Sequence, residues 1–153
     1  MKKAVLIAVS VLCLVLVFAC KSQPKPEPEP EVERTERELE LKDVYDRYRS
    51  RIILDEAETY TVVAGDSLSR IAGSQYDDEV IYPLIMLASS DVVLDPDLIE
   101  PGMELTIPNL EKNLEDEDAR AAIKEFFGEI ADIEEPRGWA DAAANLRAWA
   151  EAH

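Results

Sequence analysis

The sequence contains few of the side chains on which most enzyme active sites are built. Its 153 residues include one histidine, His153 at the last position, and two cysteines, Cys13 and Cys20. No zinc-ligand spacing, serine–histidine arrangement or phosphate-binding glycine loop is visible. Acidic runs such as 115–118 are typical of solvated helix starts and not of a glycosidase carboxylate pair. We therefore predict a protein that is not an enzyme, with no catalytic residue, metal site or cofactor.

Basic residues are also scarce. The chain has 16 Lys and Arg against 33 Asp and Glu, which gives a formal net charge of -17. This balance repels phosphate backbones and anionic lipid headgroups. The charge therefore excludes nucleic acid as an expected partner, and it excludes electrostatic attachment to a membrane.

The sequence has one long apolar run, at residues 4–19, and Lys2 and Lys3 precede it. At 1.5 Å per residue this run spans roughly 24 Å as a helix, which is shorter than the roughly 30 Å hydrocarbon core of a bilayer. A cleaved export signal fits this length better than a permanent transmembrane helix, which is the alternative. We predict that residues 1–19 are a signal peptide.

The end of the apolar run, Val17 to Cys20, resembles the lipobox of bacterial lipoproteins. That resemblance implies that Cys20 becomes the lipidated first residue of the mature chain. Residues 21–30, KSQPKPEPEP, alternate proline with polar or charged residues, which predicts an extended spacer that reaches roughly 30 Å. We therefore expect residues 20–30 to be a lipidated cysteine followed by a linker.

Residues 31–56 show a helical pattern, because apolar residues recur three and four positions apart from Leu41 to Ile52. The pattern predicts an amphipathic helix. Its apolar stripe needs a cover, which is either another part of this chain or a second copy of the protein.

The middle of the chain combines strand, turn and helix signals. Residues 60–63 predict a strand, and Asp66 in the following turn is placed to cap a helix. Pro83 fits the first turn of a second helix, and residues 105–107 predict a closing strand that ends at Pro108. The predicted order is strand, helix, helix, strand.

Two segments of this region, YTVVAGDSLSRIA at 60–72 and YPLIMLASSDVVLDPDLIEPGMELTIP at 82–108, resemble the LysM (lysin motif) family. The resemblance implies a βααβ domain over residues 59–108, with two antiparallel strands beneath two helices. It also implies recognition of glycans that contain N-acetylglucosamine, which in bacteria is usually peptidoglycan. In that family the sugar lies in a shallow groove between the loop after the first strand and the loop before the second.

Carried over to this sequence, the first loop contributes Gly65, Asp66, Ser67 and Leu68. The second loop contributes Leu94, Asp95, Pro96, Asp97 and Leu98. Backbone amides and small apolar side chains in such loops suit an uncharged amino sugar.

Residues 113–153 predict a helical hairpin, because two apolar stripes are separated by Pro136, Arg137 and Gly138. The second stripe contains Trp139 and Trp149, and we interpret these aromatic residues as core. If the hairpin instead leaves its apolar faces exposed, a protein partner becomes the expected ligand.

Together these features predict an α+β protein whose small LysM domain is flanked by an amino-terminal amphipathic helix and a carboxyl-terminal helical hairpin. The expected function is noncatalytic binding of peptidoglycan by a lipoprotein that tethers an envelope membrane to the cell wall. The alternative is a protein-interaction scaffold in the envelope that keeps the LysM fold without binding sugar. The expected location is the bacterial cell envelope, facing the periplasm if the cell has two membranes.

The lipid attachment can be tested by detergent phase separation. Cys20→Ser should move the protein from the detergent phase to the aqueous phase, because acyl chains are expected to supply the membrane attachment. Cys13→Ser is the control, since that residue lies in the segment expected to be removed. Unchanged partitioning of Cys20→Ser would refute lipidation.

Overall fold

The computed structural model describes residues 35–153. The predicted signal peptide at 1–19, lipidation at Cys20 and linker at 20–30 lie outside the described residues, and they stay predictions. Residues 31–34 of the first predicted helix also lie outside them. Within the described part, no helix has the length and apolar character needed to span a bilayer.

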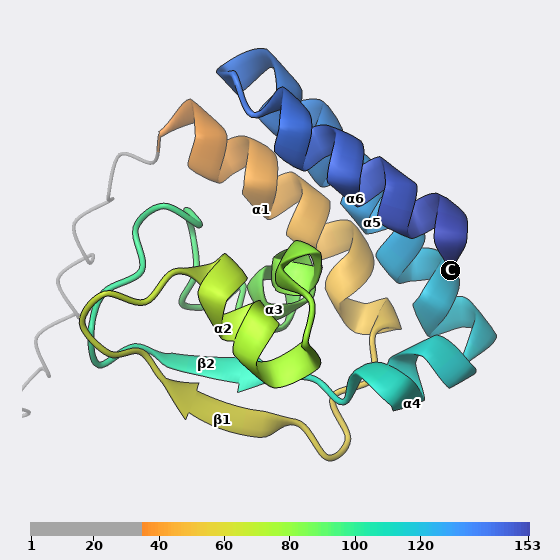
Figure 1. Ribbon diagram of the computed structural model, residues 1–153, viewed down its shortest axis with the longest axis horizontal. Helices are drawn as coiled ribbons and strands as arrows, with labels where there is room; N and C mark the ends of the chain where they lie inside the picture. Colours follow the sequence, from red (N-terminus) through yellow and green to blue (C-terminus); the bar gives the residue numbers. More distant parts are fainter. Residues whose placement is uncertain (1–34) are drawn as a thin grey trace, which may run out of the picture. The chain divides into compact units, whose positions relative to one another are not determined.

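The described chain has an α+β fold with two strands and a majority of helices (Figure 1). The α-helices are α1 (Glu36–Tyr48), α2 (Leu68–Tyr76), α3 (Tyr82–Ala88), α4 (Leu110–Glu115), α5 (Glu117–Glu134) and α6 (Ala140–Ala152). Short 3₁₀ helices are η1 (Arg49–Arg51), η2 (Glu79–Ile81) and η3 (Glu135–Arg137), and the strands are β1 (Glu58–Thr61) and β2 (Glu104–Ile107).

Helix α1 begins with a capping box. The Glu38 amide donates to the Thr35 hydroxyl at 3.2 Å, and the Thr35 amide donates to the Glu38 carboxylate at 2.6 Å. The helix ends at Tyr48 and continues only as η1, so the prediction of a helix to residue 56 is wrong at its carboxyl end. The reason is tertiary, because both backbone polar groups of Ile53 bond to the buried side chain of Asn113 at 2.8 and 2.9 Å.

The central order of strand, helix, helix, strand matches the prediction. Strands β1 and β2 pair antiparallel, with Glu58 opposite Ile107 and Thr61 opposite Glu104. Helices α2 and α3 lie above this sheet in Figure 1, and α3 contacts β2. Pro83 lies in the first turn of α3, as its fixed φ favours.

The carboxyl-terminal region contains the predicted hairpin, formed by α5 and α6 packed against each other. Asp116 caps α5 by accepting a bond from the Ala119 amide at 2.9 Å. The chain also forms α4 before the hairpin, beginning at Leu110, which the sequence pattern did not separate from it.

One hydrophobic core joins the flanking helices to the central domain. The Phe126 ring of α5 lies 6.1 Å from the Tyr45 ring and 5.9 Å from the Tyr48 ring of α1, measured between centroids. Every residue of α3 from Pro83 to Ala88 is buried. The stripe of α1 is therefore covered by its own chain.

Candidate functional site

The loop after β1 and the loop before β2 lie at the same end of the sheet, because the two strands run antiparallel. Backbone bonds continue the pairing beyond the strands. The Val62 amide donates to the Met103 carbonyl, and the Gly102 amide donates to the Val62 carbonyl, both at 2.9 Å. These bonds hold the bases of the two loops together.

Asp66 shapes the first loop from within. Its Oδ2 accepts bonds from the Val63 amide and from the Tyr60 hydroxyl, both at 2.9 Å. The prediction that Asp66 caps a helix is therefore wrong. Ser67 is the cap instead, since its hydroxyl accepts a bond from the Arg70 amide at 3.4 Å. The carboxylate of Asp66 instead bonds to the Val63 amide and closes the turn before the helix. Gly65 lies in this turn with φ of 94°, a conformation that favours glycine.

The second loop is held at its start and at its tip. At its start, the Ser89 hydroxyl accepts a bond from the Thr106 amide at 2.9 Å, which ties the end of α3 to β2. At its tip, the Asp95 carboxylate accepts a bond from the Asp97 amide at 2.9 Å. Arg37 of α1 then pairs with both carboxylates, at 3.0 Å from Asp95 and 2.5 Å from Asp97.

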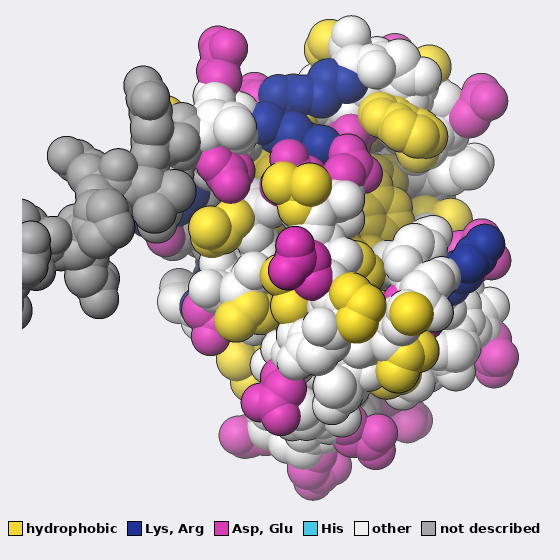
Figure 2. All heavy atoms as spheres, turned by 90° about the vertical axis from the view of Figure 1, so that its left-hand side faces the viewer, with side chains coloured by type: hydrophobic (Ala, Val, Ile, Leu, Met, Phe, Trp, Pro, Cys, Tyr) yellow, Lys and Arg dark blue, Asp and Glu magenta, His cyan; other side chains and the backbone are white. Residues whose placement is uncertain are grey.

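A pocket of about 320 Å³ lies between the loops and the flanking helices. From the central domain it is lined by Ser67, Leu68, Tyr82, Pro96 and Asp97 among others. Figure 2 looks onto this end of the molecule, where hydrophobic side chains surround a hollow and charged side chains lie at its rim. The volume is at the small end of the range for ligand pockets.

The segment that contains both loops matches a known domain family. The model of the LysM domain matches residues 60–108. Residues 60–108 are a LysM domain. LysM domains in general bind glycans such as those of peptidoglycan, and the two loops around the pocket belong to the matched segment.

Three proteins are similar to part of this chain. Esterase MT1326 and esterase Rv1288 of Mycobacterium tuberculosis are each 44% identical to it over 57 residues, which is 37% of this chain and 12% of each esterase. An uncharacterised protein of Deinococcus radiodurans is 49% identical over 49 residues, 32% of this chain and 19% of that protein. The chain thus spans less than a fifth of the length of these relatives. No solved structure gives a significant match.

The pocket gathers some of the predicted sugar-contacting residues of the LysM domain. From the first loop, Ser67 and Leu68 line it, whereas Gly65 and Asp66 do not. From the second loop, Pro96 and Asp97 line it, and Leu94, Asp95 and Leu98 do not.

The predicted residues of the second loop that do not line the pocket lie in three different environments. Asp95 supports the second loop through Arg37, and Leu94 lines a separate small hollow beside α1. Leu98 is 62% exposed. The two predicted loops therefore lie together, but only part of each loop faces the hollow between them.

Several lining residues lie outside the predicted loops of the LysM domain. Arg37, Glu134, Trp139 and Ala142 come from the flanking helices and their connections, and Tyr82 comes from the start of α3. The prediction that Trp139 belongs to the core is wrong, because it is 56% exposed, whereas Trp149 is buried. Helical spacing alone could not show which tryptophan is buried, because burial depends on a contact with another helix. The Trp149 ring lies 4.7 Å from the Phe127 ring of α5, measured between centroids.

The charged side chains that line the pocket are paired through Arg37. Its guanidinium bridges the second LysM loop to Glu134 of α5, at 2.8 Å, and Glu134 is only 4% exposed. Burial by itself would lower the pKa of Arg37, but hydrogen bonds to Asp97 and Glu134 raise it on balance. Burial and the nearby Glu134 carboxylate raise the pKa of Tyr82 to about 12, so its hydroxyl keeps its proton at neutral pH.

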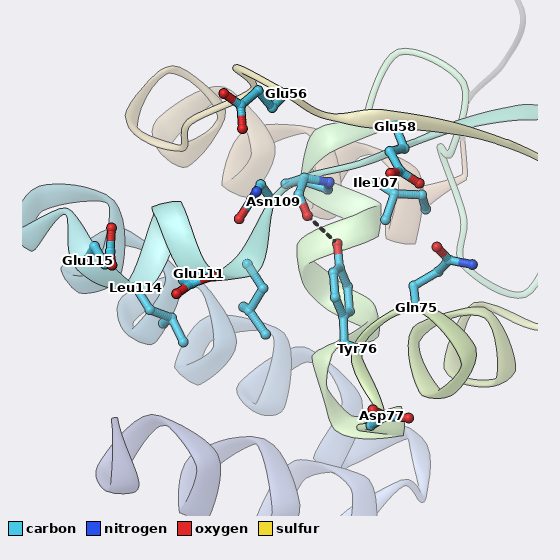
Figure 3. A pocket seen from close by; sticks show the side chains of 12 residues that line it. Glu56, Glu58, Gln75, Tyr76, Asp77, Ile107, Asn109, Glu111, Leu114 and Glu115 are labelled. Carbon is cyan, nitrogen blue, oxygen red and sulfur yellow. Dashed lines mark hydrogen bonds between the residues drawn. The ribbon is translucent and has the colours of Figure 1, made fainter.

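A larger hollow of about 650 Å³ lies elsewhere, between β1, the end of α2 and α4. Figure 3 shows its acidic side chains, which include Glu56, Glu58 and Glu111, and the Tyr76 hydroxyl that donates to the Pro108 carbonyl at 3.0 Å. Among residues 35–153 no cluster of side chains has the arrangement of a metal site. Neither predicted LysM loop lines this hollow, so it is separate from the pocket described above.

The structural role of Arg37 can be measured by urea denaturation. Arg37→Met should lower the free energy of unfolding by about 3 kcal/mol, because it leaves Glu134 as a buried charge without its partner. Adding Glu134→Gln should recover part of this loss. Arg147→Met is the matched control, since Arg147 pairs with Asp132 and Glu135 at the surface and its loss should change stability little. Equal effects of Arg37→Met and Arg147→Met would contradict this role.

Proposed function

We propose that this protein is a noncatalytic lipoprotein that binds glycans containing N-acetylglucosamine, in peptidoglycan, through its LysM domain. Attached to a membrane by lipid on Cys20, it tethers that membrane to the cell wall. The pocket between the two LysM loops supports this proposal most strongly. Both loops belong to the segment that matches the LysM family, and the hollow between them is large enough for a small ligand.

The pocket has the chemistry that an uncharged amino sugar needs. The hydroxyls of Ser67, Ser69 and Tyr82 can donate to or accept from sugar hydroxyl and acetamido groups. Apolar atoms of Leu68 and Pro96 can contact the acetamido methyl group. A few polar groups on a mainly apolar lining are typical of small-molecule sites.

The carboxylates of the pocket support a binding role and not a catalytic one. Asp97 and Glu134 both accept hydrogen bonds from Arg37, at 2.5 and 2.8 Å. A glycosidase needs one carboxyl group to protonate the leaving oxygen and a second to act opposite it. Here one guanidinium is hydrogen-bonded to both carboxylates, so Asp97 and Glu134 serve as structural partners of Arg37.

Membrane attachment would compensate for weak binding in a small pocket. A lipid on Cys20 and a spacer of roughly 30 Å would confine the domain close to the membrane, and a wall within that reach would be met at high effective concentration. Many such tethers acting together can hold two layers although each contact is weak.

Binding can be tested by sedimenting the full chain, purified in detergent, with insoluble peptidoglycan. Ser69→Trp should weaken binding about tenfold or more, because an indole at this position fills the pocket. Ser74→Trp is the matched control, since the same substitution lies on the same helix but outside the pocket. Thermal melts of both variants check that the fold is kept.

Two results would contradict the proposal. If the unaltered chain does not sediment with peptidoglycan, the alternative function as a protein-interaction scaffold is favoured. If Ser69→Trp and Ser74→Trp both bind as the unaltered chain does, the glycan binds elsewhere on the molecule.

A further inference from the structure

Trp139 is a large aromatic side chain that lines the pocket from outside the LysM domain. It belongs to the connection between α5 and α6, and it is 56% exposed. The other tryptophan of the chain, Trp149, is buried against Phe127. A solitary exposed aromatic residue is common on protein surfaces, but this one lines the same hollow as Ser67 and Leu68 of the first LysM loop.

The backbone around Trp139 is firmly held. Its amide donates to the Glu134 carbonyl at 3.2 Å, and its carbonyl accepts from the Ala143 amide at 2.9 Å. The preceding Arg137 pairs with Glu40 of α1 at 3.0 Å and donates to the Ile133 carbonyl at 2.6 Å. The indole therefore projects from a fixed base, and a ligand that covers it has little backbone to order.

We propose that Trp139 is part of the glycan-binding site and that its indole stacks on the face of a sugar ring held by the LysM loops. This inference rests on the proposed function of the same pocket. In a β-linked N-acetylglucosamine ring the hydroxyl groups point outward around the edge, which leaves faces made mostly of C–H groups. The indole suits such a face, while Ser67 and Tyr82 suit the polar edge.

The charges of the pocket narrow the ligand to a neutral sugar. Arg37 is matched by three carboxylates, Asp95, Asp97 and Glu134, so this cluster carries a surplus of negative charge. A ring with a free carboxylate would meet repulsion there, and Arg37 has both its terminal nitrogens already paired. The ligand class is therefore a run of uncharged N-acetylhexosamine units and not an acidic sugar or a free peptide carboxylate.

The test is a titration of the full chain, in detergent, with the β-1,4-linked tetramer of N-acetylglucosamine. Trp139→Ala should weaken binding about tenfold. A loss of this size is expected if roughly 50 Å² of apolar surface on the indole is covered by the sugar in the unaltered chain. Trp139→Phe should weaken it less, because a phenyl ring keeps part of the stacking face. Leu39→Ala is the control, since Leu39 is another exposed apolar side chain and does not line the pocket.

Tryptophan fluorescence provides a second readout that a purely structural role would not change. Binding of the tetramer should shift the emission of the unaltered chain to shorter wavelength, because the sugar covers an indole that is otherwise exposed to water. Trp139→Phe should lose this shift while it still binds the tetramer in calorimetry. The buried Trp149 supplies the constant background.

The outcomes separate this inference from the proposed function. If Ser69→Trp abolishes tetramer binding while Trp139→Ala binds as the unaltered chain does, the role of Trp139 is refuted and the LysM pocket stands. Binding of the tetramer without any change in emission would refute stacking in the same way. If the unaltered chain binds neither tetramer nor peptidoglycan, both proposals fail together.

Discussion

Helix α3 imposes the main constraint on this structure, because its residues from Pro83 to Ala88 are buried on all sides. A helix that is apolar around its whole circumference must be covered on every side. Contacts with α2 and β2 cover part of its surface, and α5 contributes further cover from outside the LysM domain. The flanking helices are therefore part of the same folding unit as the LysM domain, and their apolar faces are covered by it in return.

This shared core explains why the candidate site is composite. Once α1 and α5 are packed beside the domain, Arg37 can reach the second LysM loop on one side and the buried Glu134 on the other. The same packing brings the connection that carries Trp139 to the edge of the pocket. The LysM loops and the flanking helices thus line one pocket of about 320 Å³ together.

Much of the fold was predictable because its signals are local. The alternating strand residues, Pro83 at the start of α3 and the apolar spacing of α5 each act within a few positions of the chain. Features that depend on distant partners were not predictable. Asp66 closes its own loop through Tyr60 instead of capping α2, and Arg37 meets Glu134 across 97 positions. Trp139 and Trp149 share one helical pattern, and only tertiary packing decides which is buried.

The most direct test of a composite pocket is to map chemical shifts by nuclear magnetic resonance while the N-acetylglucosamine tetramer is added to the full chain in detergent. If the glycan binds in the composite pocket, the amide signals of Ser67, Leu68 and Asp97 and the indole signal of Trp139 should change together, at the same ligand concentration. Signals from the acidic hollow near Glu58 and Glu111 should stay unchanged. Changes gathered around that hollow, or changes in the LysM loops without any in the Trp139 indole, would contradict a composite glycan site.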